Sequence, residues 1–461
     1  MHDPQRTNLP TPGHRMGPRG WTLDGLTAHI DTVFAIGPGK HSQRVVCRSR
    51  LDWPMEGLQF AAPWQFGWRA PHGRFRRALG CVHRCPVHSI DLHPADDYGS
   101  TASGGSGLAP DLNQVAQIRN WLNDLNLTVD CAVVAGFPQL TATGARVPIA
   151  VWLPRVWLAD PDPTDDDGLD LCAIIDRSVP STQAATQVGQ ALQHAVSDHR
   201  TIAAVATDWR ADIQQAATLL SNSQVVLRKI VAGWPHSWPT ATDRRRVVAN
   251  ALQNRNNAWI FDVQTPDHSF VCASPELLVR CDGDNVEALA LAGTQSADGR
   301  FGPHYGDEHA TVVDFVAACW RHQGLATPQL TTQDHQDGPL IHRATRFVAP
   351  QPAGFDMLSA ALHLHPTPAL LGTPRLAALQ ALPLVERETR QWYGGFAGVV
   401  AADGSGVGQF AVLLRGIEPI SGGWRSWAGA GLVAGCDVAA ETEEIERKHA
   451  AIAQCFGLQP S

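Results

Sequence analysis

Long hydrophobic runs are missing from this sequence. No uninterrupted apolar stretch reaches the roughly 20 residues that cross a bilayer. The residues that follow Met1 also lack the apolar segment of a secretory signal peptide. The first absence argues against a membrane-spanning helix and the second against export. We therefore expect a cytoplasmic protein without a membrane partner.

Excess positive charge is missing as well. The 36 Lys and Arg residues are outnumbered by 44 Asp and Glu residues, which gives a formal net charge of −8. Proteins that bind nucleic acid usually carry a basic surface, so we expect no nucleic-acid partner. Any pocket for an anionic substrate must then be locally positive on an acidic protein.

Paired cysteine motifs are scarce. The ten cysteines are scattered along the chain, which suits a reducing compartment better than a disulfide framework. One group, Cys81, His83 and Cys85, has the residue types of a zinc site but no second matching pair. We interpret it as ordinary strand and loop residues.

What is present is the composition of a large globular protein. The chain has 461 residues, 44% of them hydrophobic, with no internal repeat and no clear linker. Residues 1–20 are rich in Pro, Gly and Arg and are expected to form a disordered leader. Short apolar runs between Gly and Pro turns then indicate antiparallel strands. An acidic loop at 160–168 is followed by helical patterns near 181–195 and 208–220.

The region 216–461 holds a series of polar and glycine-rich segments on alternating apolar strands. In chain order they lie at 273–276, 289–294, 364–374, 393–398, 409–415, 428–433 and on a helix that carries Glu441, Glu444 and Lys448. Such positions along strands and one helix predict a deep anion-binding cleft.

The order and content of these segments resemble the chorismate-utilising enzymes that supply menaquinone, siderophores and tryptophan. The stretch LHPTPALLGTP at 364–374 is most similar to isochorismate synthases. The resemblance implies an α+β fold like that of anthranilate synthase component I, with two large antiparallel sheets packed together and flanking helices. It makes 216–461 the chorismate-binding catalytic region and 21–215 a divergent N-terminal part of one composite domain.

Glu276 is the candidate general acid. It follows a predicted hairpin and precedes Leu277 and Leu278, and burial among apolar side chains would raise its pKa toward neutrality. The resemblance implies that it protonates the departing 4-hydroxyl of chorismate. A structural role, capping the next turn, is the alternative.

Gln224 and Lys229 lie on a predicted buried strand at 223–229. The resemblance places Gln224 where isochorismate and salicylate synthases carry a lysine base and where amino-transferring relatives carry glutamine. An amide cannot take a proton from water, so Gln224 is either a catalytic position or a buried hydrogen-bonding residue. Because five residues along a strand reverse the facing side, we expect Lys229 to point away from the pocket.

Several residues are candidate contacts to the substrate. By the resemblance, Gly293 allows close backbone approach and Thr294 offers a hydroxyl. His365, held extended before Pro366, suits a positioned hydrogen-bond donor, although a core histidine is the alternative. Arg415 ends an apolar strand, and a buried arginine needs an anionic partner such as a substrate carboxylate.

The remaining candidate residues would hold the substrate carboxylates and a metal ion. Tyr393 and the amides of Gly429 and Gly431 would join Arg415 around the substrate carboxylates. Glu441, Glu444 and Lys448 fall on one helical face, which without the resemblance would be an exposed ion-paired face. The resemblance implies instead that Glu308 and Glu444, with Glu441 beside them, bind Mg²⁺ and that Lys448 meets the substrate. The Lys-Asp-Arg that precedes this glutamate in relatives is missing before Glu308.

Three functions follow in order of preference. The first is isochorismate synthase, a Mg²⁺-dependent isomerase that converts chorismate to isochorismate for menaquinone or siderophore synthesis. The second is an ammonia-dependent aminodeoxychorismate or anthranilate-type synthase, which would require a separate glutaminase subunit. The third is a catalytically impaired chorismate-binding homologue, suggested by the departures at Gln224, Lys229 and Gln409.

Overall fold

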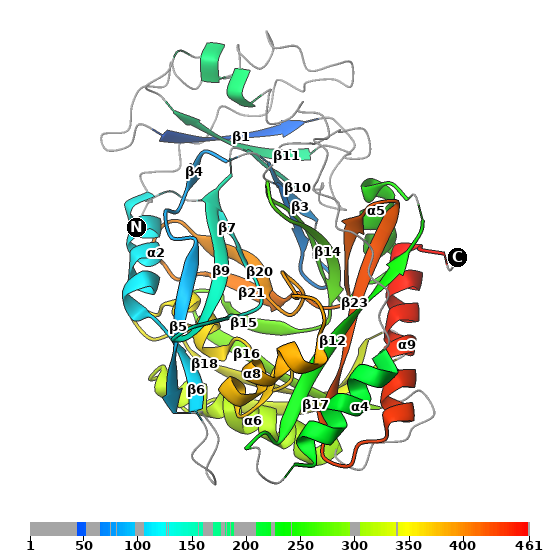
Figure 1. The fold of residues 1–461 in the computed structure, drawn as a ribbon. Coiled ribbons are helices and arrows are strands. Elements are labelled where there is room, and N and C mark those ends of the chain that lie inside the picture. Colours follow the sequence, from blue (N-terminus) through cyan, green and yellow to red (C-terminus); the bar gives the residue numbers. More distant parts are fainter. Residues whose placement is uncertain are drawn as a thin grey trace.

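A computed structural model shows the arrangement of the chain (Figure 1). It describes residues 44–51, 65–73, 75–79, 81–96, 106–125, 127, 129–154, 156–159, 169–176, 180, 182–184, 186–188, 209–222, 226–240, 242–295, 305–337 and 340–459. The expected leader at 1–20, the acidic loop at 160–168 and much of the expected helix at 181–195 lie outside these residues. Among the described helices, none is both long and apolar enough to cross a membrane.

The first of two large antiparallel sheets has 11 strands. In spatial order they are β1 (Arg44–Leu51), β11 (Leu169–Asp176), β10 (Val156–Ala159), β3 (Arg76–Leu79), β2 (Gln65–Arg69), β13 (Trp259–Gln264), β14 (Ser269–Ser274), β22 (Gly416–Ile420), β23 (Gly423–Val433), β12 (Lys229–Trp238) and β19 (Gly372–Thr373).

The second sheet has 12 strands. Its main path is β17 (Gln329–Asp337), β18 (Leu340–Pro350), β16 (Asn285–Gln295), β15 (Leu277–Cys281), β21 (Gly408–Val412), β20 (Phe396–Ala401), β7 (Asp130–Ala135), β9 (Gly144–Leu153), β5 (Ser89–Asp96) and β6 (Ser106–Pro110), with β4 (His83–Arg84) and β8 (Gln139–Thr141) paired to β9. Both sheets mix strands from before and after residue 216. The prediction of two large antiparallel sheets with helices is confirmed.

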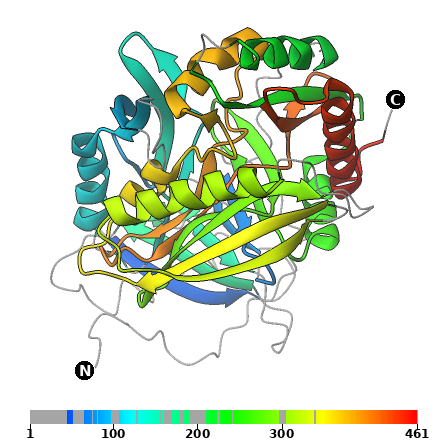
Figure 2. The same ribbon diagram turned by 90° about the horizontal axis from the view of Figure 1, so that it is seen from below.

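Helices cover the outside of the sheets. Figure 2 shows α6 running across the strands of the second sheet, and α9 stands beside β23 of the first sheet in Figure 1. The helices are α2 (Leu112–Leu125), α4 (Trp209–Leu220), α5 (Arg244–Asn254), α6 (Tyr305–His322), α7 (Met357–Leu364), α8 (Arg375–Val385) and α9 (Val438–Phe456).

Helix α9 has well-defined ends. The Asp437 side chain accepts hydrogen bonds from the backbone N–H groups of Ala439 and Ala440 at its N-terminus. Gly457 closes the C-terminus in the left-handed conformation, which glycine adopts without steric cost. Its apolar stripe packs against β23, and the neighbouring flank, with Glu441, Glu444 and Lys448, faces the cleft described below.

An aromatic core joins the inner faces of the two sheets. Phe66 of β2 meets Trp152 of β9 edge to face, with ring centroids 5.9 Å apart, and also contacts Phe261 of β13. Offset and edge-to-face aromatic pairs add about 0.5–1.5 kcal/mol each beyond their buried area. This core fixes the distance between the sheets and therefore the width of the cleft at its edge.

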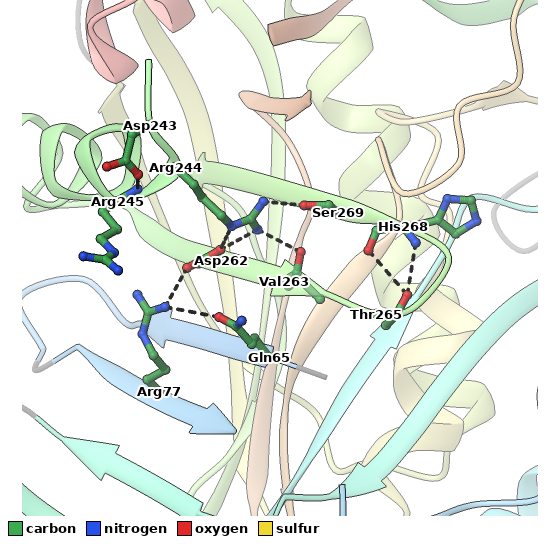
Figure 3. A network of polar contacts seen from close by, with 10 residues as sticks. All are labelled: Gln65, Arg77, Asp243, Arg244, Arg245, Asp262, Val263, Thr265, His268 and Ser269. Atoms are coloured by element: carbon green, nitrogen blue, oxygen red, sulfur yellow. Dashed lines mark hydrogen bonds and ion pairs between the residues drawn. The ribbon is translucent and has the colours of Figure 1, made fainter. Parts of the chain in front are cut away.

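A buried network of charges joins β3, β13 and α5 (Figure 3). The Asp262 carboxylate on β13 accepts a hydrogen bond from Arg244 Nε at 2.8 Å and lies 3.2 Å from Arg77 Nη1. Arg244 also donates to the Val263 carbonyl and to Ser269 Oγ. Burial alone would raise the pKa of Asp262, but the two guanidiniums hold that pKa below its ordinary value. These contacts keep the Asp262 carboxylate ionised.

One strand begins later than predicted. The sequence pattern placed a strand at 223–229, whereas β12 begins at Lys229. The reason is the length of its neighbours, since Lys229 pairs with the last residue of β23, Val433, and with Thr373 of β19. Val226 is 57% exposed, and Gln224 lies outside the described residues.

Candidate active site

A cleft of about 520 Å³ is lined by β12 and β23 of the first sheet, by β16 of the second and by α9. Its volume is typical of a site for a small molecule. Ten of the thirteen residues predicted to act line it, and they are Glu276, Gly293, Glu308, Tyr393, Arg415, Gly429, Gly431, Glu441, Glu444 and Lys448. Motifs separated by more than 100 residues in the sequence thus meet in one place.

Glu276 sits at the turn between β14 and β15. Its backbone N–H donates to Ser274 Oγ at 3.2 Å, and its carbonyl accepts from the Val412 N–H at 3.0 Å, so both neighbouring strands hold it. The residue is only 3% exposed. Burial raises the pKa of its carboxyl to about 8, although the charge of Arg415 opposes the shift. Glu276 is therefore a protonated carboxylic acid at neutral pH.

Arg415 follows β21 and points into the cleft from a strained backbone position. Its φ is 51°, in the left-handed region that residues with a side chain seldom adopt. Its Nη2 lies 3.2 Å from Nε2 of His342 on β18. The segment after β21 thus presents a guanidinium close to Glu276, as expected for a carboxylate clamp.

Tyr393 forms the opposite wall. Its ring stacks on Trp427 of β23 with centroids 5.4 Å apart, and burial raises the pKa of its hydroxyl. The phenol is therefore a neutral hydrogen-bond donor at physiological pH. The hydroxyl lies beside Gly429, where an added Cβ would come within 3.0 Å of it.

Lys448 reaches into the cleft from α9. Its Nζ contacts Glu444 Oε1 at 2.6 Å, one helical turn earlier, and donates to the Gly429 carbonyl at 2.7 Å. Burial alone would raise the pKa of Glu444, but the Lys448 ammonium holds it below its ordinary value. This pair places one fixed positive and one fixed negative charge at the floor of the cleft.

Lys229 lies in the cleft too, which corrects the prediction that it points away. The parity argument took Gln224 as the residue that faces the cleft, but β12 begins only at Lys229, and Gln224 lies outside the described residues. Its Nζ is 2.7 Å from Glu308 Oε1 of α6, and the two side chains are 7% and 25% exposed. Gly431 makes room for this contact, because an added Cβ would lie 2.8 Å from Glu308 Oε1 and 2.9 Å from Lys229 Cε.

Glu308, Glu441 and Glu444 have the chemistry of a cation site. The pKa of Glu441 is raised to about 7, first by burial and then by the charges of Glu444 and Glu308, with Lys448 and Lys229 opposing. Carboxylates that repel one another in this way fit a divalent cation, which takes oxygen ligands. Within the described residues, no three His, Cys, Asp or Glu side chains are arranged to hold an ion. Two of these carboxylates instead contact lysines.

His365 does not line the cleft, which corrects its interpretation as a donor to the substrate. It ends α7 as the C-cap, and its ring is fully buried edge-on to Phe396, with centroids 5.2 Å apart. Burial first, and then the charge of Arg375, lower its pKa to about 3, so the ring is neutral. Its place in the motif reflects packing. The side chain of Thr294, at the end of β16, lies outside the described residues.

Sequence reasoning missed Arg390 in the cleft wall. This buried guanidinium donates to the carbonyls of Leu370 and Val231 and pairs with Glu386. It thereby ties the segment before Tyr393 to β12. Nothing in its local sequence indicates this role, because the two carbonyls it binds belong to distant segments of the chain.

The sequence is similar to one family model and to several known proteins. The family described as chorismate binding enzyme matches residues 166–457. Isochorismate synthase EntC of Escherichia coli is 32% identical over 267 residues, 53% of this chain and 66% of its own length. Isochorismate synthase MenF of Bacillus subtilis is 25% identical over 215 residues, 44% of this chain and 45% of its own length. Anthranilate synthase component 1 of Streptomyces coelicolor is 30% identical over 195 residues, 39% of this chain and 38% of its own length.

Solved structures show the same fold. The menaquinone-specific isochorismate synthase MenF from Escherichia coli superimposes with a TM-score of 0.65 at 18% identity, over 94% of this chain and 99% of that one. Anthranilate synthase component I from Streptococcus pneumoniae gives a TM-score of 0.57 at 14% identity, over 92% of this chain and 96% of that one. The matched stretches of the sequence relatives above span about two fifths to two thirds of their lengths.

Proposed function

This chain belongs to the family of chorismate binding enzymes, and from that membership we propose that it is an isochorismate synthase. Chorismate would be its substrate and Mg²⁺ its cofactor, and the reaction is an isomerisation. Its product would be a precursor for menaquinone or siderophores, as the names of its relatives suggest.

The single observation that carries the proposal is the burial of the Glu276 carboxyl in the cleft beside Arg415, which favours its protonated form. In the reaction, water adds at C2 of chorismate, the ring double bonds shift, and the 4-hydroxyl leaves as water after gaining a proton. A carboxyl with a pKa of about 8 carries a proton at neutral pH and can donate it to the leaving hydroxyl. Arg415 beside it stabilises the carboxylate that remains.

The remaining residues of the cleft would orient the substrate. Chorismate carries two carboxylates, and Arg415 and Lys448 are cations positioned on opposite elements to receive them. The Tyr393 hydroxyl would donate a further hydrogen bond, and Gly429 and Gly431 allow the ring close to β23. Glu308 and Glu444 would hold Mg²⁺, with Glu441 beside them. When bound there, the ion would neutralise the ring carboxylate of the substrate.

A second function is favoured by one observation, the glutamine at position 224. If an amide stands where a base would activate water, ammonia needs no such base, because it is already nucleophilic. The chain would then form an aminated product and would work with a glutaminase partner. The cleft residues would keep the same roles, so only the nucleophile distinguishes the two proposals.

Product analysis tests these proposals directly. Purified protein is incubated with chorismate and Mg²⁺, with and without ammonium, and the products are identified by chromatography and mass. We expect isochorismate without ammonium, lost in Glu276→Gln and kept in Asp267→Asn, which makes the matched change at an exposed turn. An aminated product that needs ammonium would support the second function. Chorismate binding without any product would overturn both and identify an impaired homologue.

A further inference from the structure

The Lys229 ammonium contacts the Glu308 carboxylate at the position where the proposed Mg²⁺ would bind. Its Nζ is 2.7 Å from Glu308 Oε1, and its side chain is only 7% exposed. The backbone fixes this position, because Lys229 pairs with both Thr373 and Val433 at the start of β12. Gly431, on the paired strand β23, leaves the space that the pair fills.

A lysine and a metal ion compete for this carboxylate oxygen. Mg²⁺ binds oxygen at about 2.0–2.1 Å, so an ion on Glu308 Oε1 would lie within a few ångströms of the ammonium. Like charges at that distance repel each other. An ion therefore binds there more tightly when Lys229 moves away, and the lysine can return when the ion leaves.

Lys448 differs from Lys229 in this respect. Its ammonium also contacts a carboxylate, that of Glu444, but it donates a second bond to the Gly429 carbonyl at 2.7 Å. That bond anchors Lys448 to β23 whether or not Glu444 is engaged elsewhere. The cleft therefore has one anchored lysine and one that is bound through the carboxylate itself.

We propose that Lys229 is a tethered cation that competes with the divalent metal for Glu308. The proposal rests on the Mg²⁺ site of the proposed function and adds a regulation of that site. In the empty cleft the ammonium neutralises Glu308 and keeps the carboxylate cluster together. The metal concentration that fills the site is consequently higher than the carboxylates alone would require.

Metal binding without substrate tests the competition. Mn²⁺ is titrated into the full-length protein, and its free concentration is read from the electron paramagnetic resonance signal. Lys229→Met removes the charge and keeps most of the side-chain length, so we expect the Kd for Mn²⁺ to fall about tenfold or more, a change of about 1.4 kcal/mol per decade. Lys229→Gln is a second variant in case the first does not fold.

Two controls separate competition for Glu308 from the general effect of removing one positive charge near the metal site. Arg447→Met also removes one positive charge from the cleft lining, but its partner is the exposed Glu443 at 3.6 Å, so we expect the Kd to change less than about twofold. Lys229→Met in a Glu308→Gln background should bring no gain, because the contested carboxylate is absent. An unchanged Kd in both Lys229 variants, an equal gain in Arg447→Met, or a gain that survives Glu308→Gln would each overturn the proposal.

The readout is independent of turnover. If the protein makes no isochorismate but Lys229→Met binds Mn²⁺ more tightly, the proposed function fails and the competition stands. If isochorismate forms and the Kd is the same in both proteins, the function stands and the competition fails.

Discussion

Asp262 and Glu276 are both buried carboxyl groups, yet the protein holds them in opposite states. Asp262, 1% exposed, contacts the guanidiniums of Arg77 and Arg244, and its pKa lies below the ordinary value (Figure 3). Glu276, 3% exposed, has the opposing influence of Arg415 alone, and burial raises its pKa to about 8. The number of cations in contact decides whether a buried carboxyl is a structural anion or a reactive acid.

The largest expected effect comes from Glu276→Gln. An amide fills the same space as the protonated carboxyl but cannot release a proton, so kcat should fall by about 10²–10⁴-fold. Stability at pH 7 should change little, because one neutral group replaces another. Steady-state kinetics and thermal unfolding of the same preparation would check both parts. A large loss of stability would contradict the protonated state of Glu276.

Asp262→Asn should have the reverse effect. Removing the anion leaves two partly buried guanidiniums without their counter-charge, which costs about 3 kcal/mol of unfolding free energy. The kcat of the folded fraction should be unchanged. Urea unfolding would measure the loss. Asp334→Asn serves as the control, since its pair with Arg343 is about half exposed and 3.9 Å long, and we expect a change within about 0.5 kcal/mol.

The pH dependence of stability should separate the two groups. Because its pKa is raised from 4.5 to about 8, Glu276 keeps a proton in the folded state that the unfolded chain releases. Its contribution to stability is complete below pH 4.5 and is lost as pH rises to about 8, with a slope on the order of 1.4 kcal/mol per pH unit. The pKa of Asp262 is lowered from 3.8, so its contribution is present above that pH and is lost in stronger acid.

Unfolding free energies across pH 4 to 9 would show this slope in the wild type and its loss in Glu276→Gln. The kcat/KM for chorismate should likewise fall as pH rises through about 8, because the acid form is depleted. A wild-type profile that matches Glu276→Gln between pH 5 and 8 would show that Glu276 is ionised throughout that range.

A smaller effect is expected from two glycines of β23, one packed against backbone atoms and the other against the ends of flexible side chains. In Gly429→Ala the new Cβ would meet the Ala232 backbone oxygen at 2.5 Å, so β12 and β23 must shift, at a cost of about 1–3 kcal/mol. In Gly431→Ala it would meet the side-chain ends of Glu308 and Lys229, which can turn aside at a cost below about 1 kcal/mol. Thermal unfolding of the two variants would compare them, and equal losses would contradict the difference.

The fold was predicted from the resemblance, while local patterns indicated the individual strands. Alternating apolar residues and turns indicate strands wherever they occur, and the apolar flanks of Glu276 led us to expect the buried carboxyl that the structure places there. The gathering of Glu276, Arg415 and Lys448 followed from the resemblance, since no spacing in the chain brings them together. The catalytic and binding roles stay predictions.

The wrong or missing predictions concern residues whose surroundings are set by distant parts of the chain. The start of β12 depends on where β19 and β23 end, and no pattern near Gln224 reports those ends. The expected facing of Lys229 was wrong because it was counted from Gln224 as the residue in the cleft. His365 stands in a motif whose other members form the cleft, but its ring fills the core beside Phe396. Arg390 donates to backbone carbonyls of two distant segments, and the residues next to it in the sequence do not indicate these contacts.

The interleaving of the strands sets an order of events during synthesis. β7 lies between β9, which follows it closely in the chain, and β20, which begins at Phe396. At about 5–20 residues per second, the ribosome delivers β20 tens of seconds after β7. Through that interval the apolar β7 has one edge paired and the other open to any strand it meets. The yield of folded protein should therefore depend on how well chaperones shield the nascent chain.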